Sequence, residues 1–170
     1  FADAVTGLSG VVSGANSLVG STANDRVGNM SVSSLGGGKF YLSSPSWNSN
    51  AGAVTFIDSA APPLGAVGAG NSLVGSAAGD LVGGNGVQNL FNGKALVLSP
   101  TWNGGVGAVT WFDTAAGTIG PVSSANSLVG STAGDAIGSS GTASAGNFLG
   151  IRSPNWDNGG VVDAGAITWA

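Results

Sequence analysis

The chain of 170 residues contains 32 Gly but only four basic and eight acidic residues, and its formal net charge at pH 7 is −4. It has no Cys and no His, and all eight acidic residues are Asp. This composition excludes disulfides, thiol nucleophiles, imidazole-based acid–base catalysis and metal sites built from Cys or His, so we expect neither an enzyme nor a cofactor.

The distribution of charged and apolar residues argues against two further classes. Binding to nucleic acid needs clustered Lys and Arg, whereas the four basic residues here are scattered. Gly, Ser and Asn interrupt the apolar stretches, so none approaches the roughly 20 residues of a membrane-spanning helix. Phe1 is neither an initiator Met nor the start of a signal-peptide pattern, and we expect a processed chain or part of a longer one.

A segment that begins Asn-Ser-Leu-Val-Gly occurs three times, starting at Asn16, Asn71 and Asn126, at a spacing of 55 residues. A Ser-Pro-x-Trp motif returns once in each unit as well. A fixed period of this length indicates a propeller, a solenoid or another repeat array, in which one unit cannot bury its apolar face alone. The predicted units are residues 1–55, 56–110 and 111–170.

Within the first unit the pattern predicts short strands and very little helix, because Gly, Ser and Thr interrupt every helical periodicity. A first strand covers about residues 31–35, and a Gly-rich turn leads to a second strand at 39–44, which indicates a β-hairpin. A third strand covers 52–58, and the Asn-Ser-Leu-Val-Gly segment is a candidate fourth strand. Three or four short antiparallel strands per unit match the size of a propeller blade, so the predicted fold is all-β.

Several short motifs follow one another in the first unit. They are Leu18-Val-Gly20, Asp25-Arg-Val-Gly28, Phe40-Tyr-Leu-Ser-Ser-Pro45 and Gly52-Ala-Val-Thr-Phe56. Together they resemble the FG-GAP blade of integrin-like β-propellers, and this resemblance implies that each unit is a propeller blade. The unit is also similar to tandem repeats of large secreted bacterial proteins of the hemagglutinin-like or adhesin-like kind, which implies an extracellular or bacterial cell-surface location.

The unit departs from the integrin-like pattern in the loop between the first two strands. There the family carries an Asp-x-Asn-x-Asp-Gly calcium loop. The equivalent segments of this chain do not match that motif; they are residues 35–38 (Leu-Gly-Gly-Gly), 90–93 (Leu-Phe-Asn-Gly) and 143–146 (Ala-Ser-Ala-Gly). Hard cations bind several oxygen ligands that include carboxylates, and these three segments contain no carboxylate. We therefore expect no metal site in these loops.

A β-solenoid is the alternative fold, but its coils are usually about 20 residues long and the unit shows no such sub-period. Three units are also too few to close a propeller, which typically needs about four to eight blades. The chain starts at the end of a third strand and stops after one, and exposed strand edges favour pairing with another copy. We therefore expect the partner to be the chain itself, as head-to-tail copies in a filament or as adjacent repeats of a longer array.

One Trp per unit follows the Ser-Pro pair, at Trp47, Trp102 and Trp156. A ring of such residues on loops would offer platforms on which sugars stack, and the alternative function is therefore a carbohydrate-binding, lectin-like propeller with surface glycans as ligands. The other interpretation is that each Trp packs against a neighbouring unit, because a large aromatic side chain buries much area in a chain rich in Gly and Ala. The aromatic residues of the third strand are predicted to be core residues: Phe56, Trp111 and Trp169.

One Asp per unit recurs at equivalent positions, at Asp25, Asp80 and Asp135, and the last two directly follow a Gly. Each is either a ligand carboxylate or a turn residue whose side chain accepts hydrogen bonds from its own backbone, and the second interpretation is favoured. The turn interpretation is likewise favoured over a ligand carboxylate for the Asp residues that end the third strand: Asp3, Asp58 and Asp113. The segment 157–163 differs from its equivalents and holds two Asp residues, which are too few to indicate a cation site alone.

The sequence therefore predicts a non-catalytic structural or adhesive module of an extracellular bacterial surface protein. Ser is plentiful, but no general base is evident that would activate a Ser nucleophile. The structural function and the carbohydrate-binding alternative differ in one observable property, which is whether the three loop Trp residues are buried between units or exposed to solvent.

Overall fold

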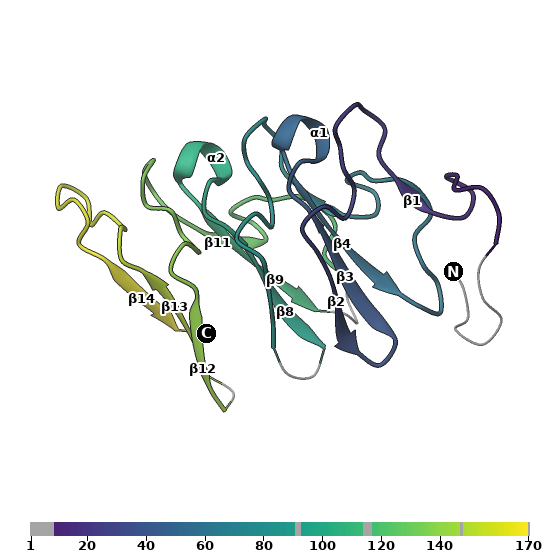
Figure 1. Ribbon diagram of the computed structural model, residues 1–170. Coiled ribbons are helices and arrows are strands. Elements are labelled where there is room, and N and C mark those ends of the chain that lie inside the picture. Colours follow the sequence, from purple (N-terminus) through teal and green to yellow (C-terminus); the bar gives the residue numbers. More distant parts are fainter. Residues whose placement is uncertain (1–8, 91–92, 114–116, 147, 170) are drawn as a thin grey trace.

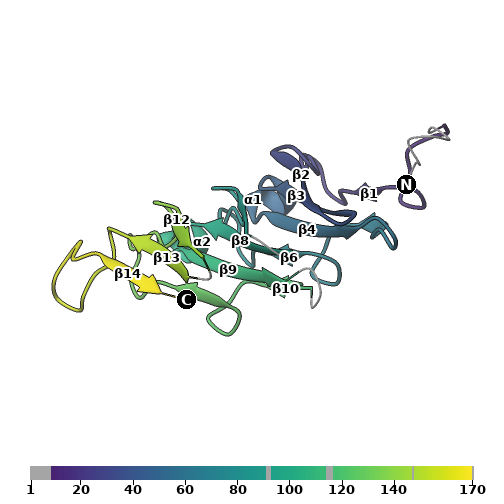
Figure 2. The same ribbon diagram turned by 90° about the horizontal axis from the view of Figure 1, so that it is seen from below.

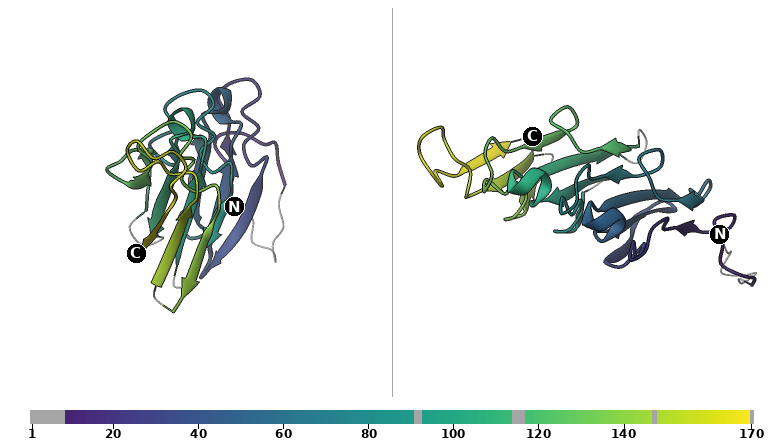
Figure 3. Two further views of the ribbon diagram at one scale, coloured as in Figure 1. Left: turned by 90° about the vertical axis from the view of Figure 1, so that its left-hand side faces the viewer. Right: turned by 90° about the horizontal axis from the view of Figure 1, so that it is seen from above.

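The computed structural model of the chain describes residues 9–90, 93–113, 117–146 and 148–169. Small sheets follow one another in a row, with β1 near one end of the row and β14 at the other (Figure 1). Figure 2 shows the same row from below, and Figure 3 shows it along its length and from above. The described part of the chain is an open array with no closed barrel, and the predicted all-β fold of tandem repeats is confirmed.

The described residues form fourteen short strands and two short helices. The strands are β1 (Leu18–Val19), β2 (Ser31–Gly36), β3 (Lys39–Ser44), β4 (Ala53–Asp58), β5 (Gly65–Ala66), β6 (Leu73–Val74), β7 (Val87–Asn89), β8 (Lys94–Ser99), β9 (Ala108–Asp113), β10 (Gly120–Pro121), β11 (Ser127–Val129), β12 (Thr142–Ala145), β13 (Phe148–Ser153) and β14 (Ala166–Trp169). The helices are α1 (Trp47–Asn50) and α2 (Trp102–Gly105). The strands expected in the first unit thus correspond closely to β2, β3 and β4.

Two sheets repeat the same antiparallel order of strands. In sheet 1, β2, β3 and β4 form a meander and β6 pairs with β4; in sheet 2, β7, β8 and β9 form the meander and β11 pairs with β9. Sheet 3 consists of β12, β13 and β14 in the same order. The fourth strand of sheets 1 and 2 is the Asn-Ser-Leu-Val-Gly segment, which lies one unit further along the chain and so links neighbouring units.

Two parallel pairings extend this arrangement. β10 pairs with β6, so sheet 1 has five strands, and β5 pairs with β1 in the same way. Each of these short strands precedes an Asn-Ser-Leu-Val-Gly strand in the chain. The pairings are therefore a second connection between successive units, made entirely by backbone hydrogen bonds.

The two short helices are turns with left-handed backbone. Asn48 has φ 48° and ψ 65°, and Ser49 has φ 58° and ψ 39°. Asn103 and Gly104 take the same conformation in the next unit. Asn and Gly adopt left-handed backbone more readily than other residues. The very low helix content expected from the sequence is therefore confirmed.

The apolar core lies between neighbouring sheets, so that the middle sheet buries both of its faces. On β8, Ala95 and Val97 belong to the cluster shared with sheet 1, whereas Leu96 and Leu98 belong to the cluster shared with sheet 3. A third cluster, which includes Val67 and Val74, lies between sheet 1 and the pair of β1 and β5. Each sheet thus packs on its nearest neighbours, as in other repeat arrays.

The prediction that all three aromatic residues of the third strand are core residues is wrong for two of them. Phe56 is half-buried, and its ring stacks on that of Phe112 from the next unit with an interplanar angle of 5°. Trp111 is 45% exposed and Trp169 is 72% exposed. In the third unit the position that matches Phe112 is Ala170, so Trp111 lacks an equivalent ring to stack on. Trp169 lies on the face of sheet 3 that points away from sheet 2.

Candidate functional site

Each Asn-Ser-Leu-Val-Gly strand is followed by a turn that closes on a buried carboxylate. Asp25 and Asp80 are 3% exposed and Asp135 is 1% exposed. In the second unit, Oδ2 of Asp80 accepts hydrogen bonds from the backbone N–H groups of Ser76 and Ala77, at 2.8 and 2.9 Å. The favoured interpretation of these Asp residues, as turn residues that bind their own backbone, matches this geometry.

The second carboxylate oxygen connects the turn to a neighbouring loop. It accepts a hydrogen bond from the backbone N–H of the residue that follows the loop Trp. The pairs are Asp25 with Asn48 (2.9 Å), Asp80 with Asn103 (3.0 Å) and Asp135 with Asp157 (3.1 Å). One buried carboxylate per unit therefore ties two separate segments of backbone together.

For Asp25 and Asp135 these hydrogen bonds favour the ionised carboxylate. Burial alone would raise the pKa of Asp25, but the hydroxyl of Thr22 and the backbone N–H groups of Thr22, Asn48 and Ser21 donate to its oxygens and together lower the pKa to about 2. For Asp135 burial is likewise outweighed by donors from its own turn, and its pKa is lowered. At neutral pH these groups are negative charges whose hydrogen-bonding capacity is already engaged within the protein.

The loops after Trp47 and Trp102 also contact the turn of the following unit. Gly52 has φ 80°, and a Cβ at this position would lie 2.3 Å from the backbone nitrogen of Val82. Gly107 has φ 79°, and a Cβ there would lie 2.2 Å from the nitrogen of Ile137. The N–H of Val82 donates to the carbonyl of Ala51 at 3.0 Å. This close backbone contact leaves room only for glycine.

Loops and turns therefore alternate along one edge of the row, the edge that carries α1 and α2 in Figure 1. We call this region the loop edge. Its loops are residues 47–52, 102–107 and 156–165, and its turns are residues 20–28, 75–83 and 130–138. Each inner loop accepts hydrogen bonds from the turn that follows it and donates one to the Asp of the turn that precedes it. The loop edge is thus a repeated polar connection between the units, in addition to the strand pairings.

The three loop Trp residues pack between units. Trp47 is 8% exposed and lies with Ala51 and Val74 in the cluster beside β1; its Nε1 is buried without a hydrogen-bond partner. Trp102 and Trp156 are half-buried, Trp102 against the cluster between sheets 1 and 2 and Trp156 against the cluster between sheets 2 and 3. These positions agree with the packing interpretation. Carbohydrate binding by these residues stays a prediction.

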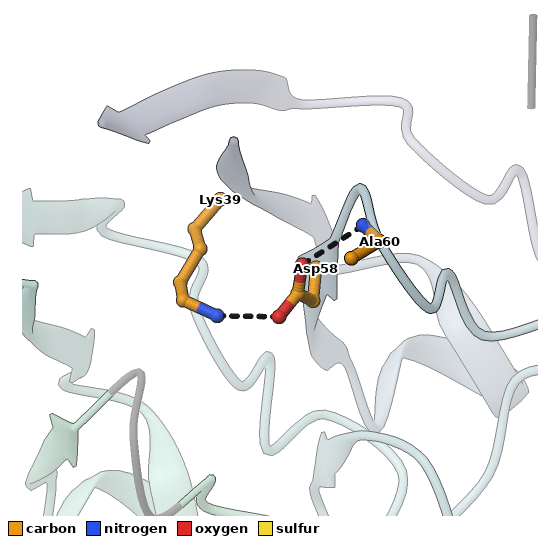
Figure 4. Close-up of polar contacts among 3 residues, drawn as sticks. All are labelled: Lys39, Asp58 and Ala60. Atoms are coloured by element: carbon orange, nitrogen blue, oxygen red, sulfur yellow. Dashed lines mark hydrogen bonds and ion pairs between the residues drawn. The ribbon is translucent and has the colours of Figure 1, made fainter. Parts of the chain in front are cut away.

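The opposite edge of the row carries ion pairs. Lys39 Nζ lies 2.5 Å from Asp58 Oδ2, and Asp58 Oδ1 accepts a hydrogen bond from the N–H of Ala60 at 2.9 Å (Figure 4). The hydrogen bond from Lys39, followed by that from Ala60, lowers the pKa of Asp58. Lys94 and Asp113 form the equivalent pair. The sequence interpretation missed these pairs, although a Lys at the start of the second strand in two units was a usable signal.

The remaining Asp residues singled out from the sequence are Asp3, Asp157 and Asp163. Asp3 lies outside the described residues. Asp157 accepts a hydrogen bond from the backbone N–H of Asp163 at 2.8 Å and one from the hydroxyl of Thr132 at 3.1 Å. Within the described ranges, no group of three or more His, Cys, Asp or Glu side chains is arranged to hold a metal ion. None of the helices in the described part of the chain has the length and apolar character that crossing a bilayer requires.

Comparison with known proteins identifies the repeat. A family model described as a repeat of unknown function, DUF5650, matches residues 1–29, 34–84, 89–139 and 142–170. No curated protein and no solved structure matches the chain. Each of the two longest matches begins near the end of the first strand of a sheet, β2 or β7, and runs through the turn that closes on the buried Asp. The resemblance to integrin-like blades stays a prediction.

Proposed function

The chain belongs to the DUF5650 family of repeats, and on this premise we propose that it is a non-catalytic structural module of an extracellular bacterial surface protein. In this role its units continue into a longer array or filament that holds adhesive parts of the protein away from the cell. The module supplies length and mechanical resistance, and the chemistry of recognition or adhesion belongs to the surface of the assembled array.

The observation that carries this proposal is the repeated joint at the loop edge. Asp80 is 3% exposed and holds the backbone of two segments, and Gly52 and Gly107 fit against the following turn with no room for a side chain. Charged donors and acceptors are rare in this chain. The buried carboxylates serve these joints, which is expected of a protein selected for a regular, stiff succession of units.

Single-molecule force spectroscopy of the whole chain, tethered at its two ends, tests the structural function. We expect discrete unfolding peaks whose contour-length increments are multiples of about 180–200 Å, the extended length of one 55-residue unit. Because neighbouring units share a core, we expect some of them to unfold in pairs, and an increment of two unit lengths also supports the proposal. Extension without force peaks would contradict the proposal.

A glycan-array measurement separates this function from the carbohydrate-binding alternative. The structural proposal predicts no glycan-specific signal from the isolated chain. Binding of a glycan that is lost on Trp102→Leu, with the fold retained by circular dichroism, would favour the lectin-like function. The corresponding change at Trp111, which is 45% exposed and lies outside the loop edge, is the matched control.

A further inference from the structure

The outward face of sheet 3 matches faces that are buried elsewhere in the row. Val54 is 0% exposed and Val109 is 2% exposed, each facing the next sheet. Ile167, at the equivalent position of β14, is 57% exposed, and Trp169 beside it is 72% exposed. An apolar sheet face of this kind is normally covered in a repeat array.

A hollow lies next to this face, at the position that a turn occupies in the inner units. Its volume is about 490 Å³, and it is lined by residues 152–154 and 164–167. Gly165 is the equivalent of Gly52 and Gly107, which lie against the turn of the following unit. The three atoms nearest to a Cβ on Gly165 all belong to Pro154, the closest at 3.1 Å, and none belongs to a turn. The place of the next turn is therefore open.

The last loop already has the backbone conformation of the two inner loops. Gly165 has φ 73°, close to the 79° of Gly107, and Asp163 has a positive φ of 51° as Asn50 has one of 66°. The N–H of Gly165 donates to the carbonyl of Trp156 at 2.9 Å, as its equivalents do to Trp47 and Trp102. Although this loop is longer than the others, the part that would accept a turn is preformed.

The matching turn is present at the other end of the row. Turn 20–28 repeats the conformation of turn 75–83, with φ 43° at Arg26 and φ 48° at Leu81. Val27 is half-buried, whereas its equivalent Val82 is 0% exposed. Among the described residues β1 pairs only with β5, whereas β6 pairs on both of its edges. This turn therefore has a free side that fits a loop such as 156–165.

We infer that a second copy of this chain docks here, with its β1 and turn 20–28 against β14 and loop 156–165 of the first copy. The inner joints fix the register. Leu18 of the second copy lies opposite Ile167, as Leu73 lies opposite Val54. Ser17 of the second copy lies opposite Thr168. The equivalent residues of the inner joints are a Thr and a Ser whose hydroxyl oxygens lie 2.7 Å apart: Thr55 with Ser72 and Thr110 with Ser127.

Backbone hydrogen bonds complete the contact. In the inner joint, the N–H groups of Leu81 and Val82 donate to the carbonyls of Asn50 and Ala51, each at 3.0 Å. In the docked pair, Arg26 and Val27 of the second copy donate to the carbonyls of residues 163 and 164. Within the described part of the chain, no backbone N–H outside the strands donates to these two carbonyls. Because the donor and acceptor lie at opposite ends of the row (Figure 1), copies add head to tail.

This inference rests on the proposed structural function and identifies its partner as another copy of the same chain. The test uses the absence of native Cys. Ser17→Cys and Thr168→Cys are made in separate chains, mixed at high concentration and oxidised. Opposed residues of antiparallel strands lie at the Cα separations that disulfides require. We expect the mixed disulfide to form at least about ten times faster than in the control mixture of Ser59→Cys with Thr168→Cys, because Ser59 is exposed but remote from the contact.

The products distinguish the possible results. A chain that carries both Ser17→Cys and Thr168→Cys gives a ladder of linear oligomers, whereas a single-variant mixture stops at the dimer. A rate equal to that of the control mixture, or a faster link between two Thr168→Cys chains, would overturn the inference. If the chain fails this test but still shows 55-residue unfolding steps, the contact is wrong and the structural function stands.

A second variant keeps the inference testable without disulfides. Ile167→Asp places a charge on an exposed side chain, so the monomer should retain its circular dichroism and melting temperature. Sedimentation equilibrium should show self-association of the unchanged chain and a loss of about tenfold or more in association constant for Ile167→Asp. Equal association of the two chains, or no association of the unchanged chain at any accessible concentration, would also overturn the inference.

Discussion

The same positions of the repeat form two different regions of the molecule. In the joint between sheets 1 and 2 they are buried, and on the outward face of sheet 3 they are exposed to solvent. Val54 is 0% exposed in the joint, and Ile167 is 57% exposed on the outward face. The φ angles of the loop glycines nearly coincide. Local backbone structure is thus set within one unit, whereas burial is set by the neighbour, as expected of a repeat that cannot cover its own face.

The largest expected effect breaks the inner joint by adding one methyl group. Gly107→Ala would place a Cβ 2.2 Å from the backbone nitrogen of Ile137 and would strain a φ of 79°, so we expect the free energy of unfolding to fall by about 3–5 kcal/mol. Gly165→Ala has a similar φ strain, but its Cβ would lie 3.1 Å from the carbonyl oxygen of Pro154 and against no neighbouring turn. It should therefore lower the free energy of unfolding by only about 1–2 kcal/mol. Chemical denaturation of both variants checks this, and equal losses would contradict the account of the joint.

Removing the charge of the buried Asp is the next largest change. Asp80→Asn turns one acceptor into an N–H₂ donor that faces the N–H groups of Ser76 and Ala77 or of Asn103. We expect a loss of about 2–4 kcal/mol in the free energy of unfolding. The control is Asp58→Asn, which removes a surface ion pair and should change stability far less. A loss at Asp58 as large as that at Asp80 would show that the joint is not special.

Truncation of equivalent apolar residues compares the two regions directly. Val109→Ala removes two methyl groups from a cluster between sheets 2 and 3, so we expect a loss of about 2–3 kcal/mol. Ile167→Ala removes more atoms from the outward face and should cost less than about 1 kcal/mol in the monomer. Thermal and chemical unfolding at low protein concentration are the measurements. The prediction is wrong if the ranking is reversed.

Acid should weaken the joints gradually. The folded pKa of Asp25 is about 2, below its ordinary value of 3.8, so its contribution to stability is fully present above about pH 5 and is lost as the pH falls through 2. For one such group the contribution is on the order of 2 kcal/mol. Unfolding experiments between pH 6 and 2 should therefore show a decrease that is smaller in an Asp25→Asn variant. Parallel curves for the two chains would exclude a role of this carboxylate.

Much of one unit could be predicted from the sequence, because its signals are local. The hairpin of β2 and β3 follows from alternating residues around a Gly-rich turn, and the turn role of Asp25 follows from its position beside a recurring segment. The close contact of Gly52 with Val82 could not be predicted, because a glycine in a loop gives no indication of the backbone that approaches it. Trp111 was misplaced for a similar reason: its burial depends on which residue the next unit supplies.

Hydrogen exchange of the unchanged chain, measured by mass spectrometry at low and at high protein concentration, tests most directly whether these units are completed by neighbours. The account predicts that peptides covering residues 18–28 and 163–169 both exchange more slowly at high concentration. Peptides of the inner joint, such as residues 104–113, should show no change. Protection that appears elsewhere while these two segments stay unaltered would contradict it.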